Sequence, residues 1–191
     1  MRIILTGAQG TGKTSVMNAL PDRYKQFGIK EVIRNMSHQD PSIKINQNSN
    51  NESQDKFFFE YLYLFSKYPE YISDRGLLDV CAYTLWLVDM GKCQYYTYEK
   101  QLYILQEWIN THPDEIYIYF PIYFPVVDDG YRDTDENNRK DVDRYIQEIL
   151  NKCGVQYHTI SNSPVSNRVE EIIRLCEWKN NAYINDPLSS C

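Results

Sequence analysis

The stretch GAQGTGKT, from Gly7 to Thr14, decides the fold of this chain, because it fits the phosphate-loop pattern G-x-x-x-x-G-K-[ST]. The apolar run MRIIL precedes it and predicts a short strand. The residues that follow, from Lys13 to Leu20, predict a helix. Backbone N–H groups of such a glycine-rich loop point inward and hold phosphate oxygens. The sequence therefore predicts a site for a nucleoside triphosphate, ATP or GTP.

We expect this loop to supply most of the nucleotide site. The Lys13 ammonium is expected to reach the β- and γ-phosphates, and the Thr14 hydroxyl is expected to ligate Mg²⁺. Other loop residues are expected to surround the phosphates through their backbone and side chains: Gly7, Gln9, Gly10, Thr11, Gly12 and Ser15.

The overall composition is that of a globular protein with one core. The chain has 191 residues, of which 42% are hydrophobic and 24% are charged. The net charge of −6 argues against broad electrostatic binding to nucleic acid. The longest apolar stretch, residues 77–90, contains two aspartates and is too short to cross a bilayer. Because strand and phosphate loop occupy residues 1–14, we expect no leader peptide, no membrane association and a cytoplasmic location.

Cysteine spacing excludes the common cysteine-based sites. The five cysteines are far apart and include no C-x-x-C pair, so the sequence predicts neither a disulfide framework nor a zinc site. The chain is also rich in tyrosine, with 17 residues. Tyrosines can fill strands and half-buried helix faces, or they can form a stacking surface for bases. Composition alone leaves these two interpretations open.

Apolar strands and helical periodicities alternate along the chain, which predicts a parallel sheet covered by helices on both faces. The expected strands are residues 2–6, 29–33, 71–73, 115–120 and 156–160. The expected helices are residues 57–66, 77–90, 98–110, 140–152 and 165–178. The predicted fold class is therefore α/β, a three-layer P-loop sandwich in a single domain of residues 1–179, followed by a flexible tail of residues 180–191.

Two polar stretches interrupt the alternation. Residues 35–51 are rich in asparagine and predict a mobile surface loop. Residues 121–139 contain two prolines and several acids, and they predict a lid that closes over ATP. A solvated loop held by salt bridges is the alternative for this second stretch.

Asp74 and Arg75 follow an apolar strand and precede a helix, at the carboxyl end of the predicted sheet. Ligands of open α/β folds bind in the crevice at this edge. An aspartate there can orient Mg²⁺ or accept the proton of an attacking hydroxyl, and an adjacent arginine can hold a substrate oxygen. A helix N-cap beside a solvated arginine is the alternative.

Glu31 and Arg34 stand at the end of the second predicted strand, at the same edge of the sheet. We expect either side chain to meet the acceptor of a transferred group. The alternative is that both are surface residues beside a loop.

Arg132 and Arg139 belong to the predicted lid. Phosphoryl transfer develops negative charge on the equatorial oxygens, and a mobile arginine can stabilise that charge. We therefore expect a catalytic contribution from both arginines.

A GTPase switch is the main competitor among phosphate-loop proteins. Such proteins recognise guanine through an N-K-x-D sequence. The nearest match here is Asn151-Lys152-Cys153-Gly154, which lacks the aspartate. This absence makes the switch the weaker interpretation.

Taken together, these motifs resemble the P-loop nucleoside and nucleotide kinases, in the branch that includes ribosylnicotinamide kinase domains and phage-type small-molecule kinases. The resemblance rests on GAQGTGKT at 7–14, the pair Glu31 and Arg34, SDRGLLDVCAYT at 73–84, and DDGYR with a downstream arginine at 129–139. It implies a five-stranded parallel sheet with the phosphate-loop strand at its centre.

The resemblance also implies roles for individual residues. Lys13 and Thr14 are expected to bind Mg-ATP, Asp74 to lie near the acceptor hydroxyl and the metal, and Arg75 to bind the substrate. Residues 35–70 are expected to recognise the acceptor, with Gln54 as a base-contacting amide.

The function expected from the sequence is transfer of the γ-phosphoryl group of Mg-ATP to a nucleoside or nucleotide. Two alternatives stay open. One is a kinase that phosphorylates a 5-hydroxymethyl pyrimidine within DNA, and the other is a P-loop regulatory ATPase or switch. Exposed aromatic residues are compatible with a dimer, but the sequence does not require one.

Overall fold

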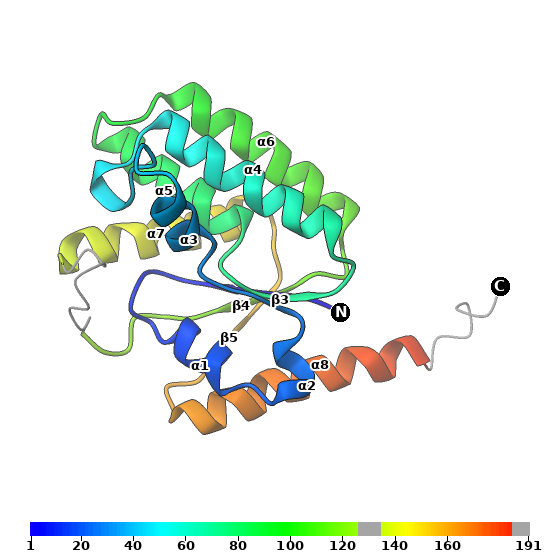
Figure 1. Ribbon diagram of the computed structural model, residues 1–191. Coiled ribbons are helices and arrows are strands. Elements are labelled where there is room, and N and C mark those ends of the chain that lie inside the picture. The colour runs from blue at the N-terminus through cyan, green and yellow to red at the C-terminus, as the bar shows by residue number, and fades with distance from the viewer. Residues whose placement is uncertain (126–134, 185–191) are drawn as a thin grey trace.

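A five-stranded parallel sheet forms the centre of the protein, with the strand order β2-β3-β1-β4-β5. The computed structural model describes residues 1–125 and 135–184 (Figure 1). The strands are short: β1 (Arg2–Thr6), β2 (Gly28–Ile29), β3 (Tyr71–Asp74), β4 (Ile116–Tyr119) and β5 (Tyr157–Thr159). The strand that leads into the phosphate loop is thus the central one, as the resemblance implies.

Helices cover both faces of this sheet. They are α1 (Lys13–Ala19), α2 (Asp22–Lys25), α3 (Val32–Gln39), α4 (Asn51–Lys67), α5 (Leu77–Asp89), α6 (Tyr95–Thr111), α7 (Glu136–Lys152) and α8 (Val165–Ile184), with a 3₁₀ turn at Asn46–Asn48. Figure 1 shows α4, α5 and α6 on one side of the sheet and α1 and α8 on the other. The predicted fold class, an α/β three-layer P-loop sandwich, is confirmed.

The alternation of side chains along β1 divides the core into two parts. Ile4 belongs to the apolar cluster under α4 to α7, whereas Ile3 and Leu5 belong to the cluster under α1 and α8. All three side chains are at most 1% exposed. Burial of each such side chain stabilises the fold by about 1.5–3 kcal/mol. The central strand is therefore held from both faces.

Strand register brings the expected site residues to one edge. Leu5 of β1 lies opposite Asp74 of β3, and Thr6 lies opposite Tyr119 of β4. Because all pairs are parallel, the phosphate loop after β1 and the Asp74 side chain meet at the carboxyl edge of the sheet.

The second predicted strand, residues 29–33, is wrong for most of its length. β2 ends at Ile29, Glu31 takes a left-handed backbone conformation (φ 55°), and α3 begins at Val32. The helix forms because Val32, Ile33 and Met36 have helical spacing and pack on the core under α4 and α5.

The predicted mobile loop at residues 35–51 is also partly wrong. α3 continues through Gln39, and Asn46–Asn48 forms the 3₁₀ turn. Asn50 then caps α4, because its side-chain oxygen accepts a hydrogen bond from the Ser53 N–H at 2.9 Å. The asparagines of this stretch therefore serve as turn and cap residues.

Two further boundaries differ from the sequence prediction. Residues 136–139, expected in the lid, form the first turn of α7 behind an Asp135 N-cap. α8 continues through Ile184, into the stretch expected as a tail. The central part of the predicted lid, including Arg132, lies outside the described residues.

Candidate active site

The phosphate loop has the backbone geometry that only glycine adopts easily. Gly7, Gly10 and Gly12 have φ values of 147°, 69° and 94°. At Gly7 there is also no room for a side chain, because a Cβ atom would lie 2.5 Å from the Phe120 carbonyl oxygen. The loop therefore passes close over the end of β4, and the glycines of the motif make this path possible.

Lys13 lies within this loop. Its side chain is 4% exposed, and its Nζ donates to the carbonyl oxygens of Gly7 at 2.8 Å and Ala8 at 2.7 Å. A third hydrogen bond goes to Thr11 Oγ1 at 3.0 Å. The ammonium is thus held beside the backbone that is expected to hold phosphate.

Thr14 and Asp74 meet at the junction of the loop and β3. The Thr14 hydroxyl donates to Asp74 Oδ2 at 2.5 Å. Mg²⁺ prefers oxygen ligands and commonly uses one or two protein oxygens together with substrate phosphates and water. Among the described residues, no group of three or more His, Cys, Asp or Glu side chains could hold a metal ion alone. The Thr14–Asp74 pair therefore fits a magnesium ion that is shared with a bound nucleotide.

Asp79 supports the phosphate loop, a role that the sequence analysis did not assign. Its side chain is 1% exposed and accepts hydrogen bonds from Thr6 Oγ1 at 3.1 Å, the Gly7 N–H at 3.1 Å and the Gly76 N–H at 3.0 Å. Burial raises the pKa of this carboxyl group, against the lowering effect of nearby Arg75 and Lys13. The sequence feature that could have identified Asp79 is its position three residues after Gly76, which is the spacing of a helix capping box.

Replacing Asp79 with asparagine is expected to lower the free energy of unfolding by about 2 kcal/mol. Asparagine keeps one acceptor oxygen but presents an NH₂ group where a carboxylate oxygen now accepts, so a buried N–H loses its partner. Urea unfolding measures the change. Asp22→Asn is the control, since that exposed carboxylate forms a surface ion pair with Lys25 at 3.0 Å and its substitution should cost less than about 0.5 kcal/mol. Equal losses in the two variants would contradict this role.

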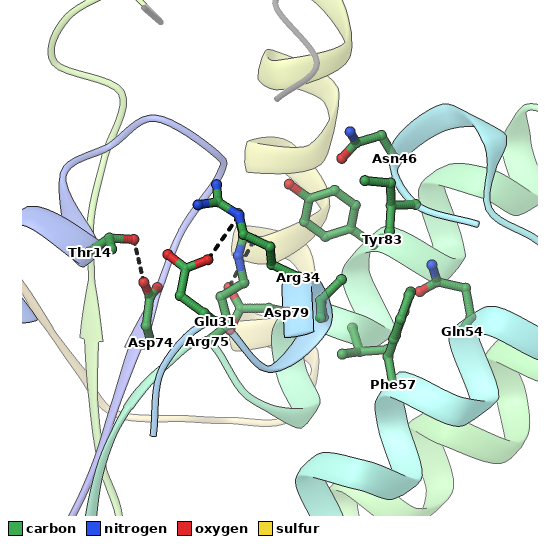
Figure 2. A pocket seen from close by; sticks show the side chains of 13 residues that line it. Thr14, Glu31, Arg34, Asn46, Gln54, Phe57, Asp74, Arg75, Asp79 and Tyr83 are labelled. Carbon is green, nitrogen blue, oxygen red and sulfur yellow. Dashed lines mark hydrogen bonds and ion pairs between the residues drawn. The ribbon is translucent and has the colours of Figure 1, made fainter. Parts of the chain in front are cut away.

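A pocket beside the Thr14–Asp74 pair brings together all the residues expected to meet the acceptor. Figure 2 shows Glu31, Arg34 and Arg75 facing Gln54 and Phe57 of α4 across this pocket. Arg34 Nε forms an ion pair with Glu31 Oε2 at 3.0 Å, and both residues line the pocket. We call this the acceptor pocket; its lining is Thr14, Glu31, Ile33, Arg34, Ile45, Asn46, Gln54, Phe57, Asp74, Arg75, Asp79, Val80 and Tyr83.

Gln54 is held in the pocket wall by its own hydrogen bonds. Its Nε2 donates to Ser49 Oγ at 2.8 Å, and its Oε1 accepts from Thr84 Oγ1 at 3.2 Å. Thr84 has one hydroxyl proton, which it shares between Gln54 Oε1, the Val80 carbonyl oxygen at 2.9 Å and Gln101 Oε1 at 2.7 Å. The amide is therefore oriented before any ligand arrives.

Phe57 and Tyr83 also line the acceptor pocket, and the sequence analysis assigned a role to neither. The Tyr83 hydroxyl donates to Gln9 Oε1 at 2.7 Å, and the guanidinium of Arg75 lies 5.1 Å from the Tyr83 ring centre. Tyr83 thus connects the acceptor pocket with the phosphate loop. Its helical spacing from Asp79 placed both on one face of α5, but only the tertiary structure brings that face to the loop.

A second pocket lies on the other side of the phosphate loop and shares Thr14 and Arg75 with the first. We call it the donor pocket; its lining is Gly10, Thr11, Gly12, Lys13, Thr14, Ser15, Arg75, Phe124, Pro125, Asn162, Ser163, Pro164, Val165 and Arg168. Thr14 and Arg75 therefore belong to the walls of both pockets.

Arg139 lies away from both pockets. It is fully buried in the first turn of α7, and its guanidinium donates to the backbone of the phosphate loop. The sequence predicted an arginine of a mobile lid at this position, but Arg139 lies in α7, where carbonyl groups of the phosphate loop accept hydrogen bonds from its guanidinium.

Comparison with known proteins agrees with the observed fold. The model of a family described as AAA domain matches residues 2–168. The structure of deoxyadenosine kinase from M. mycoides, with products dCMP and a flexible dCDP bound, is similar with a TM-score of 0.64 and 14% identity, over 93% of this chain and 99% of that chain. No curated protein matches the sequence significantly.

Two other solved structures have a similar fold. NadR protein in complex with NR gives a TM-score of 0.65 and 15% identity, over 93% of this chain and 50% of that chain. YorR from Bacillus subtilis, in complex with phosphorylated GDP, gives a TM-score of 0.57 and 16% identity, over 95% of this chain and 98% of that chain. The resemblance to the P-loop nucleoside and nucleotide kinases is thus confirmed at the level of the fold. Within the described residues, no helix is both long and apolar enough to span a membrane.

Proposed function

Because the chain belongs to the AAA-domain family whose model matches residues 2–168, we propose that it is a Mg-ATP-dependent phosphotransferase of the nucleoside and nucleotide kinase type. It would transfer the γ-phosphoryl group of ATP to a nucleoside or nucleotide. The observation that carries this proposal is the junction of the two pockets at Thr14 and Arg75. A donor and an acceptor bound in two pockets that share these residues would be held in contact. Such positioning is most of what phosphoryl transfer requires.

On the donor side, Lys13 and the loop backbone would hold the phosphates of ATP. Mg²⁺, when bound, would neutralise charge on the transferred group, with Thr14 and Asp74 as its protein ligands. Arg75 lines both pockets and would hold an oxygen at the boundary between donor and acceptor.

On the acceptor side, Glu31 is the carboxylate best placed to take up a proton. Asp74 accepts a hydrogen bond from the Thr14 hydroxyl and would therefore belong with the metal, whereas Glu31 lines the acceptor pocket beside Arg34. As the acceptor hydroxyl bonds to the γ-phosphorus and the bond to ADP breaks, Glu31 would accept the hydroxyl proton. No covalent enzyme intermediate is needed.

The charges around the acceptor pocket favour a neutral hydroxyl over a phosphate as the acceptor. Of its described lining residues, two carry guanidinium groups, and each lies near a carboxylate: Arg34 at 3.0 Å from Glu31 and Arg75 at 4.0 Å from Asp79. Asp74 adds a further carboxylate. A nucleoside monophosphate would bring about two more negative charges to this surface, and juxtaposed like charges cost binding free energy.

We therefore expect a nucleoside to be preferred over its own 5′-monophosphate by at least about tenfold in kcat/KM, or about 1.4 kcal/mol. The measurement is ADP release from Mg-ATP against ribo- and deoxynucleosides, their monophosphates, ribosylnicotinamide and DNA that contains hydroxymethylated pyrimidines. Release that depends on one acceptor supports a kinase and names its substrate.

Preference for a monophosphate would contradict the charge argument and leave the kinase proposal intact. Release only with the modified DNA would favour the base-modifying kinase. ADP release that is the same with every acceptor would instead favour an ATPase or switch.

A further inference from the structure

Two buried arginines donate hydrogen bonds to backbone carbonyl oxygens of the phosphate loop. Arg139 Nε donates to the Gln9 carbonyl oxygen at 2.9 Å, and its Nη2 donates to the Gly10 carbonyl oxygen at 3.2 Å. Arg168 Nη1 donates to the Thr11 carbonyl oxygen at 3.3 Å. Three consecutive peptide groups of the loop are thus fixed by side chains from α7 and α8, which are far apart in the sequence.

Both guanidinium groups are also anchored outside the loop. Arg139 Nη1 donates to the Phe124 carbonyl oxygen at 2.9 Å and pairs with Glu136 at 3.1 Å. Arg168 Nε donates to the Ser163 carbonyl oxygen at 2.8 Å, and its guanidinium lies 5.5 Å from the Phe124 ring centre. The loop is therefore tied to the segment after β4 and to the start of α8.

Burial of the two guanidinium charges lowers the stability of the fold unless other groups or a bound ligand compensate them. Arg139 is 0% exposed and Arg168 is 4% exposed. Among the described residues, the polar contacts of the Arg168 guanidinium are with carbonyl oxygens and none is an ion pair with a carboxylate, although Arg168 lines the donor pocket. A buried guanidinium without a counter-ion is unfavourable, and an anion in the donor pocket would offset this cost.

The direction of the hydrogen bonds explains how the arginines can act. In a phosphate-binding loop the N–H groups point toward the anion and the carbonyl groups point away. A planar guanidinium donates to two carbonyls at once, which a lysine cannot do. Carbonyls fixed in this way keep the neighbouring N–H groups aimed at the phosphates before nucleotide binds, and such preorganisation strengthens binding.

We propose that Arg139 and Arg168 form an arginine brace that holds the phosphate loop in its phosphate-binding conformation and places two positive charges behind it. Arg139 lines neither pocket and is a positioning residue that acts through the loop backbone, whereas Arg168 holds the loop backbone and also lines the donor pocket. This role differs from that of a mobile lid arginine, which contacts the transferred phosphoryl group directly. The inference rests on the proposed use of the loop as the donor site.

The test is equilibrium binding of Mg-ATP to Arg139→Lys and Arg168→Lys, measured by calorimetry without any acceptor. Each variant is expected to raise the Kd for ATP about tenfold, because lysine keeps the charge but loses the fork of donors. KM for the acceptor should stay unchanged. The controls are Arg144→Lys on α7, whose exposed side chain lies 3.7 Å from Asp141, and Arg174→Lys on the exposed face of α8.

Chemical rescue distinguishes the proposed role of Arg139 from a purely structural one. In Arg139→Ala, millimolar guanidinium should restore ATP binding if the missing fork of donors is the cause. A Kd within twofold of the controls for both folded lysine variants would overturn the brace, and so would a failure of guanidinium to improve binding to Arg139→Ala. Because binding is measured without turnover, a wild-type protein that binds ATP but transfers nothing would count against the proposed function and leave the brace standing.

Discussion

Replacing Lys13 with alanine lowers turnover by roughly 10³-fold or more on this account, while the protein stays folded. The Nζ atom is held by the carbonyl oxygens of Gly7 and Ala8 in the middle of the phosphate loop. It is the cation placed to meet the β- and γ-phosphates, where negative charge develops during transfer. Initial rates with saturating acceptor, together with thermal unfolding of both proteins, measure the effect.

The matched control for this variant is Lys25→Ala. Lys25 lies in α2, where its ammonium forms a surface ion pair with Asp22 at 3.0 Å. The control should keep wild-type turnover, because surface ion pairs contribute little. Activity retained in Lys13→Ala would contradict the proposal that this loop is the catalytic donor site.

Replacing Asp74 with asparagine is expected to lower kcat by about 10²-fold or more, with a smaller effect on ATP binding. The amide can still accept the Thr14 hydroxyl, so the local hydrogen bond survives. What it loses is the negative charge with which the Asp74 carboxylate would attract Mg²⁺. The Mg²⁺ concentration required for half-maximal turnover should therefore rise, and a magnesium titration at fixed ATP measures it.

Glu31→Gln is the comparison that separates the two carboxylates. Glu31 lines the acceptor pocket and does not line the donor pocket. Its substitution should lower kcat and leave the magnesium requirement as in the wild type. If Asp74→Asn lowers kcat and ATP affinity equally and leaves the magnesium requirement unchanged, Asp74 has a structural role instead.

Much of the donor side of the site can be predicted from the sequence, because its residues are local. The phosphate loop follows β1 directly, and the apolar residues Ile3 and Leu5 identify that strand. Asp74 ends β3 in the same way. Once the strands are known to be parallel, their carboxyl ends must share one edge, so the meeting of Thr14 and Asp74 follows from topology.

The acceptor side could be predicted only in part. The apolar pair Val32-Ile33 suits a strand as well as a helix, and the choice depends on packing against α4, which is remote in the sequence. The left-handed backbone at Glu31 ends β2 early and turns that carboxylate toward the pocket. No local sequence pattern predicts a left-handed backbone conformation at a glutamate.

Buried polar side chains were the hardest to assign. Arg139 was predicted to belong to the lid, yet it is fully buried against the backbone of the phosphate loop. Asp79 and Arg168 likewise act on a loop that lies far away along the chain. Their roles depend on which backbone groups are left without partners in the folded state, and that information appears only in three dimensions.

The most direct test of the central claim is transfer of radioactive phosphate from γ-labelled ATP. The protein is incubated with Mg-ATP and the best acceptor, and the products are separated by chromatography. The account predicts label on the acceptor, in step with ADP formation, and none with Lys13→Ala. Label that appears only as inorganic phosphate, at a rate that no acceptor changes, would contradict the account and identify an ATPase.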